Sequence, residues 1–226
     1  SIFKSLMRFS FPFLLASLLQ ALYGAADLFV VGQYADSAAV SAVAIGSQVM
    51  QTITGVILGI TTGGTILIGQ YLGAKREKDM AKTVGTIICV FGLFSIVLTI
   101  FMTLFTNPIA TIMHTPVESL KYTQQYIFIC SCGIPFIIGY NAVSGILRGM
   151  GDSKTPLYFI AIACVINIAV DIILVDFFKM GAIGAAIATV GAQGISFILA
   201  VLFLWKKGFP FEFGKNISGC FLKKLR

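Results

Sequence analysis

Six long apolar runs divide the sequence, and none of them has a Lys or Arg in its interior. A helix of about 20 apolar residues crosses the roughly 30 Å of hydrocarbon in a bilayer. Of the 226 residues, 58% are hydrophobic and 11% are charged, too few charges to cover a water-soluble domain. We therefore predict an all-α integral membrane protein with six transmembrane helices in a single lobe, residues 1–205. The predicted spans are about residues 9–34, 39–72, 83–106, 120–147, 157–175 and 182–205.

The basic residues lie almost entirely on one side of these spans. If the amino end is cytoplasmic, 14 of the 16 Lys and Arg residues fall inside, in the amino-terminal segment, loops 73–82 and 148–156, and the tail 206–226. The positive-inside rule then predicts that both termini are cytoplasmic, in a multi-pass protein of the cell membrane. The net charge of +7 would face lipid headgroups, so we expect no nucleic-acid partner. The same count places Asp36, His114 and Lys179 outside.

Small residues recur every four positions in two spans. Gly55, Gly59 and Gly63 share one face of the second span, and Gly184 and Ala188 share a face of the sixth. Such stripes let helix backbones approach closely in lipid. The pattern predicts close helix packing along both faces.

Two carboxylates, Asp27 and Asp171, lie inside predicted spans. A charged group at membrane depth is costly and by default marks a transport pathway or coupling site. The alternative is a carboxylate close enough to a helix end to reach interfacial water. Each has polar neighbours at helical spacing, which favours the functional interpretation. In the first span Gln20 and Tyr23 share a helix face with Asp27, and in the fifth span Asn167 lies one turn before Asp171. Thr189 and Gln193 are a similar pair, one turn apart, in the sixth span, and Asn141 is a further amide in the fourth.

The depths of four of these residues agree. At about 1.5 Å per residue, Asp27, Asn167, Asp171 and Thr189 lie roughly 15 to 27 Å from the inner ends of their spans. They can meet in the outer half of the bilayer. Carboxylate, amide and hydroxyl oxygens suit a small hard cation, and loss of hydration favours protonation of a carboxylate, so the ion is either Na⁺ or H⁺. An acidic cavity favours organic cations as substrates.

Enzymatic and nucleotide-driven functions are disfavoured. The chain has one His and no pairing of a nucleophile with a base, so we expect no enzyme. Loop 148–156 lacks the Gly that a phosphate-binding loop has directly before its Lys, here Lys154. We predict no resident cofactor, and energy supplied by an ion gradient.

Five segments in combination resemble the amino-terminal half of the multidrug and toxic compound extrusion (MATE) transporters, of the bacterial DinF-like type. The likeness runs from Pro12 to about Arg226. The segments are DLFVVGQYADSAAVSAVAIGSQV (27–49), TGGTILIGQYLGAKR (62–76), GILRGMGDSKTP (145–156), NIAVDIIL (167–174) and GAIGAAIATVGAQ (181–193).

The resemblance implies a twelve-helix protein of two six-helix lobes that exports drugs or metabolites in exchange for Na⁺ or H⁺. It implies a cation site at Asp27, Asn167, Asp171 and Thr189. It also places Gln20, Tyr23 and Asn141 near that site, and a helix bend at Pro12. A proline at a helix start is the alternative interpretation of Pro12.

The chain has only six predicted spans. It is therefore either part of a longer transporter or the partner of a second lobe, which is a missing carboxy-terminal half or another copy of itself. Two alternative functions remain open. A lipid-linked oligosaccharide or polysaccharide flippase would need cationic residues facing the cavity, and a membrane assembly protein would use the acidic residues structurally.

Overall fold

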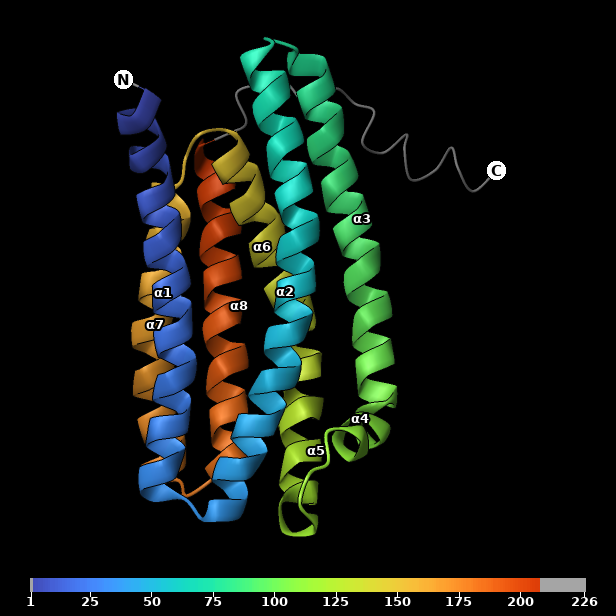
Figure 1. Cartoon of the computed structure of the whole chain (residues 1–226), viewed down its shortest axis with the longest axis vertical. Coiled ribbons are helices and arrows are strands. Elements are labelled where there is room, and N and C mark those ends of the chain that lie inside the picture. The colour runs from blue at the N-terminus through green and yellow to red at the C-terminus, as the bar shows by residue number, and fades with distance from the viewer. Residues whose placement is uncertain (1, 208–226) are drawn as a thin grey trace.

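The computed structural model describes the backbone of residues 2–207, with the side chains of residues 7 and 10–206, and this part of the chain contains helices but no strand (Figure 1). The predicted basic tail, 206–226, lies outside the described residues from residue 208 onward. The helices are α1 (Ile2–Tyr34), α2 (Ser37–Gly73), α3 (Glu77–Leu104), α4 (Thr106–Ile112), α5 (Val117–Cys132), α6 (Ile134–Gly149), α7 (Lys154–Asp171), the π-helix η1 (Ile172–Phe177) and α8 (Gly181–Lys207).

The helices confirm the predicted membrane fold. Five of them are long and apolar enough to cross a bilayer, and α5 with α6 makes a sixth candidate if the bent pair is one span. The predicted fourth span, 120–147, is thus two helices that meet at an angle of 46°. The predicted third span, 83–106, ends inside the short helix α4, because α3 stops at Leu104.

The break between α5 and α6 has a local cause. Pro135 has no backbone N–H, so it cannot donate to the carbonyl one turn earlier. Gly133 caps α5 by donating its N–H to the carbonyl of Cys130 at 3.0 Å. A Cβ at Gly133 would lie 2.6 Å from a methyl of Val190 on α8. Glycine at this position lets the break pack directly against α8.

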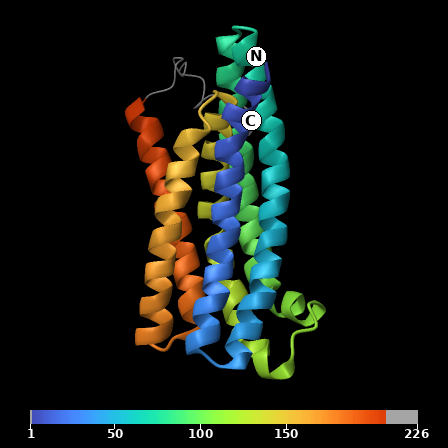
Figure 2. The ribbon, with the colours of Figure 1, turned by 60° about the vertical axis from the view of Figure 1, so that its left-hand side comes forward.

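The helices run side by side along one axis (Figures 1 and 2). Here α1 packs on α7, α7 on α8, and α2 on α5 and α6. The N-terminus, the α2–α3 turn and the end of α8 lie at one end of the bundle, and the α1–α2 loop, α4 and the α7–α8 turn lie at the other. The main apolar core lies between α2, α5 and α6, where Val43, Ile57, Ile127 and Ile134 are fully buried.

The two small-residue stripes behave differently. On α8, a Cβ at Gly184 would lie 3.1 Å from two neighbouring side chains, and Ala188 is buried. On α2, a Cβ at Gly55, Gly59 or Gly63 would meet no atom of the described residues within 4 Å. The prediction of close packing is confirmed for α8 and wrong for α2 within this chain, because the α2 stripe faces outward.

Pro12 lies well inside α1 rather than at its start. The interpretation of Pro12 as a helix-start residue is therefore wrong. A bend of α1 at this residue stays a prediction.

Candidate functional site

A buried polar cluster forms where α1, α7 and α8 meet. Asp27 lies on α1, Asn167 and Asp171 lie in the last turns of α7, and Thr189 lies on α8. The exposed fractions of Asp27, Asn167 and Asp171 are 2%, 0% and 0%. The Thr189 hydroxyl donates to a carboxylate oxygen of Asp27 at 2.8 Å, and the side chains of Asp171 and Asn167 lie close to the same carboxyl without a hydrogen bond to it. The structure thus brings together the four residues whose depths agree.

The backbone changes its winding at the acidic residue on α7. Asp171 is the last residue of α7, and the π-helix η1 begins at the next position. A π turn adds one residue per hydrogen-bonded ring, so it rotates the following side chains relative to an α-helix. Such turns occur frequently at functional sites. Here the change of winding begins next to a fully buried carboxylate.

The cluster leaves five polar atoms without a hydrogen-bond partner among the described residues. They are one oxygen of Asp27, both oxygens of Asp171, and the side-chain nitrogen and oxygen of Asn167. Two ionised carboxylates cannot satisfy each other, because both are acceptors only. Buried polar groups are normally paired, since an unpaired one costs about 1–3 kcal/mol. The arrangement has the ligand atoms to hold a small hard cation or to take up protons.

A cavity of about 310 Å³ adjoins the cluster, between α1, α2, α5, α6 and α8. Asp27 and Thr189 line it, so they belong to both the cluster and the cavity. Gln193 and Tyr23 line it too, and the Gln193 amide donates to the Tyr23 hydroxyl at 3.4 Å. Gln20 is also in the lining.

Three of the candidate residues do not line this cavity. Asn167 and Asp171 are absent from its lining and interact with Asp27, the residue that does line it. The Asn141 amide donates to the carbonyl of Ile137 on its own helix at 2.8 Å. Asn141 therefore lies in the interior of α6, outside both the cavity lining and the contacts of Asp27.

Part of the polar lining was not predicted from the sequence. Ser17, Ser47, Gln51 and Tyr126 also line the cavity. The Ser47 hydroxyl and the Tyr126 hydroxyl form a hydrogen bond of 3.1 Å, and the ring of Tyr126 packs directly on Gly46, where a Cβ would clash with it. Ser47 and Gln51 are four residues apart in an apolar run, a spacing that could have identified them.

The charge of the described cavity lining is negative. Asp27 is the acidic residue of the lining, and no Lys or Arg occurs among the lining residues that the structure describes. A wall of this kind attracts cations, and the low dielectric of the surrounding hydrocarbon strengthens the attraction.

Comparisons with known proteins agree with this architecture. The MatE family model matches residues 12–173. Probable multidrug resistance protein YoeA of Bacillus subtilis is 34% identical over 221 residues, which are 96% of this chain and 48% of that protein. Multidrug export protein MepA of Staphylococcus saprophyticus is 29% identical over 210 residues, or 92% of this chain and 46% of that protein. A crystal structure of MATE in the bent conformation aligns with a TM-score of 0.86 at 22% identity, over 95% of this chain and 50% of that chain.

The bundle of apolar helices defines the class first: a multi-pass membrane protein, whose relatives carry the names of multidrug resistance and multidrug export proteins. Within that class the chain belongs to the MatE family, so the resemblance seen in the sequence is confirmed. The chain spans about half the length of the curated relatives that it matches.

Proposed function

We propose that the chain is one lobe of a secondary antiporter that exports drugs or organic metabolites, cationic ones by preference, in exchange for Na⁺ or H⁺. The observation that carries the proposal is that Asp27 belongs both to the buried polar cluster and to the cavity lining. One oxygen accepts the hydrogen bond from Thr189 while the carboxyl interacts with Asp171 and Asn167, and the same residue lines the cavity.

In this proposal Asp27, Asn167, Asp171 and Thr189 bind the coupling ion. The unpaired oxygens of the two aspartates and of Asn167 supply the ligands, and the Thr189 hydroxyl adds another. Gln20, Tyr23 and Gln193 belong to the supporting network or contact the substrate from the cavity wall. Asn141 is left out of the ion site, because its amide is bonded within α6.

Sharing Asp27 provides a physical basis for exchange. A cation or proton that enters the cluster neutralises Asp27 and so removes negative charge from the cavity. An organic cation in the cavity then loses its counter-charge and is released. The two ligands weaken each other's binding by the same factor, as linkage between two sites requires.

Export also requires a second lobe. Alternating access is largely the rocking of one repeat against another around a central site. On α2, a Cβ at Gly55, Gly59 or Gly63 meets no described atom, and Gly55 also lines the polar cavity, so this stripe supports a partner lobe on the side of the cavity, because small residues allow close helix contact in lipid. We propose a missing carboxy-terminal half or a second copy as that partner, with both termini of this chain in the cytoplasm.

The cavity lining favours this function over the flippase alternative. A flippase would hold the pyrophosphate of a lipid-linked sugar with cationic side chains, and the described lining has none. An assembly protein with a purely structural acidic pair would not need unpaired carboxylate oxygens beside a cavity.

Ion binding to the full 226-residue chain tests the proposal. In lipid nanodiscs, we expect saturable ²²Na⁺ binding, or proton uptake, that Asp171→Asn removes. Asp176→Asn is the matched control, because Asp176 lies five residues further on, is partly exposed, and pairs with Lys179 at 3.1 Å. Equal binding by wild type and Asp171→Asn would refute the ion site.

A further inference from the structure

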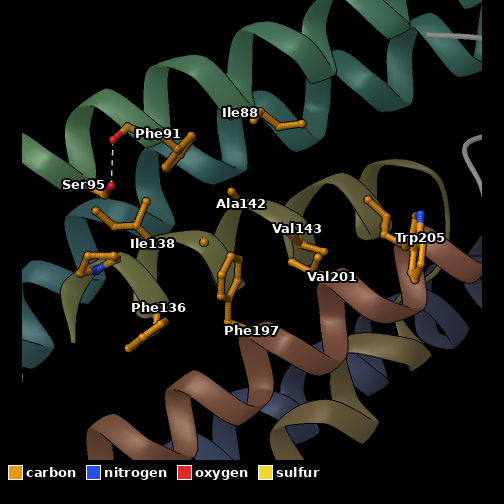
Figure 3. Close-up of a pocket in the computed structure, with 14 residues that line it drawn as sticks. Ile88, Phe91, Ser95, Phe136, Ile138, Ala142, Val143, Phe197, Val201 and Trp205 are labelled. Carbon is orange, nitrogen blue, oxygen red and sulfur yellow. Dashed lines mark hydrogen bonds between the residues drawn. The ribbon is translucent and has the colours of Figure 1, made fainter.

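A second cavity, of about 670 Å³, lies between α3, α6 and α8 and is open along one side (Figure 3). Its lining is almost wholly apolar and includes Phe91, Phe136 and Phe197. Among the lining residues that the structure describes, Ser95 and Trp205 alone carry polar side-chain groups, and the Ser95 hydroxyl donates to the carbonyl of Gly92 at 2.8 Å. We call this cavity the α3–α6–α8 groove. Its volume lies within the roughly 300–1,000 Å³ typical of small-molecule sites.

The groove and the polar cavity are separate. Adjacent residues of α6 line different spaces, since Ile137 lines the polar cavity and Ile138 lines the groove. On α8, Gln193 lines the polar cavity and Phe197, one turn further on, lines the groove. A Cβ at Gly139 would clash with the ring of Phe197, so α6 and α8 are in direct contact beneath the groove. These two helices form the wall between the spaces.

The medium beside the groove is the bilayer. Both α3 and α8 are among the helices long and apolar enough to span a membrane. The exposed side chains of α3 include the apolar Leu93, Ile96 and Val97. An open apolar groove between such helices lies in hydrocarbon, where acyl chains are the surrounding molecules.

One end of the groove has the features of a membrane interface. Trp205 is 82% exposed, and Trp is enriched at the level of lipid headgroups. The exposed Lys206 follows it directly. This end of the bundle has seven basic residues with described side chains and three acidic ones, Glu77, Asp79 and Asp152. The basic residues are Lys75, Arg76, Lys78, Lys82, Arg148, Lys154 and Lys206.

We propose that the α3–α6–α8 groove binds one acyl chain of an anionic phospholipid, from the leaflet at the Trp205 end, with the lipid phosphate next to Lys206. The apolar lining matches an acyl chain, and the excess of basic residues matches an anionic headgroup. An organic cation fits poorly, because no acidic side chain of the described residues lines the groove. The site is independent of the ion cluster and of the substrate cavity.

Trp205 is the only tryptophan of the chain and lines the groove, so it reports on the occupant. The full chain is reconstituted in phosphatidylcholine nanodiscs with increasing fractions of phosphatidylglycerol or phosphatidylcholine brominated on the acyl chain. Bromine quenches tryptophan at contact. We expect brominated phosphatidylglycerol to quench at lower fractions, with an affinity preference on the order of fivefold from one lysine near the headgroup.

Three variants make the test specific. A Cβ at Gly92 meets no described atom within 4 Å, so a side chain at this position begins in open space. The variant Gly92→Phe is designed to fill the groove, and we expect the preference for phosphatidylglycerol to disappear. Gly191→Phe is the matched control, because Gly191 is equally open but outside the lining, and it should quench like wild type. Lys206→Gln should reduce the preference and leave quenching by phosphatidylcholine unchanged. Helix content from circular dichroism checks the fold of each variant.

Two results would overturn the proposal. Equal quenching by both lipids in wild type and all variants would mean that Trp205 senses only bulk lipid. Weak quenching by either lipid, together with cross-linking of chains through the groove, would make a second copy the occupant.

Discussion

The polar cavity and the α3–α6–α8 groove share a wall and differ in almost everything else. The polar cavity is lined by Asp27, Gln20, Tyr23 and other hydrogen-bonding side chains, while the groove has Ser95 and Trp205 as its only polar side chains. The groove has about twice the volume, 670 against 310 Å³. The volume of a cavity therefore does not identify the functional site in a membrane protein, because apolar hollows fill with lipid and polar ones need a specific guest.

The two spaces also differ in how closely they are packed. In the polar cavity, the Tyr126 ring fits only because position 46 is glycine, and its hydroxyl is held by Ser47. In the groove, Gly139 on α6 is packed closely against the Phe197 ring, but on the α3 side a Cβ at Gly92 would lie in open space. Defined side-chain positions suit the recognition of an ion or substrate, and open apolar space suits a flexible chain.

The largest expected effect is on transport, because the polar cavity of this chain is only one half of a transport site between two lobes. We expect the 226-residue chain alone in liposomes to show no gradient-driven dye uptake, because a single lobe has no second surface to rock against. Co-reconstitution with a carboxy-terminal lobe should restore uptake. Robust uptake by the chain alone that is lost in Asp171→Asn would instead show a self-sufficient half-transporter, most simply a homodimer.

The next largest effect is on the acidic pair in the complete transporter. We expect Asp27→Asn and Asp171→Asn each to lower ethidium export by roughly 100-fold, near the upper end of the usual coupling range between sites, with expression largely retained. Asp176→Asn, in an exposed ion pair, and Gly92→Phe, in the groove, should export normally. Export at the wild-type rate by either aspartate variant would remove that residue from the coupling site.

Labelling from outside the cell sharpens the comparison by deciding which leaflet the groove opens to. In a Cys-free background, single cysteines at Ser37 and Lys179 should react with an impermeant maleimide in intact cells, and one at Lys78 should not. These residues lie at opposite ends of the bundle, with Lys78 at the end where α8 finishes. The reverse pattern would invert the topology and move the groove opening to the outer leaflet.

The smallest effect compares the packing of the two spaces. Gly46→Ala should destabilise the protein by about 1–3 kcal/mol, because the new methyl clashes with the Tyr126 ring. Gly92→Ala should leave stability unchanged or raise it by up to about 1 kcal/mol, since alanine favours helix and the space is open. Thermal unfolding in detergent, followed by circular dichroism, measures both. Equal changes would show that the two spaces are packed alike.

The success of the sequence analysis at the acidic cluster has a simple physical basis. A helix advances by a constant rise per residue, so Asp27, Asp171 and Thr189 could be placed at similar depths by counting. Counting does not give the rotation of each helix about its axis. For this reason Ser47 and Tyr126 were missed. The family resemblance, rather than counting, predicted Asn141 near the site, and its amide bonds within α6.

The sequence by itself determined the all-helical membrane fold, the presence of two carboxylates inside spans, and the family. It could do so because hydrocarbon penalises every charge and every unpaired backbone group, so the pattern of apolar runs leaves few alternatives. Only the tertiary structure decided that Thr189 donates to Asp27, 162 positions away, that the fourth span breaks at Gly133, and that Ile137 and Ile138 face different spaces. These features depend on how each helix is rotated about its axis and which distant residues it packs against. The hydropathy of the sequence does not determine either.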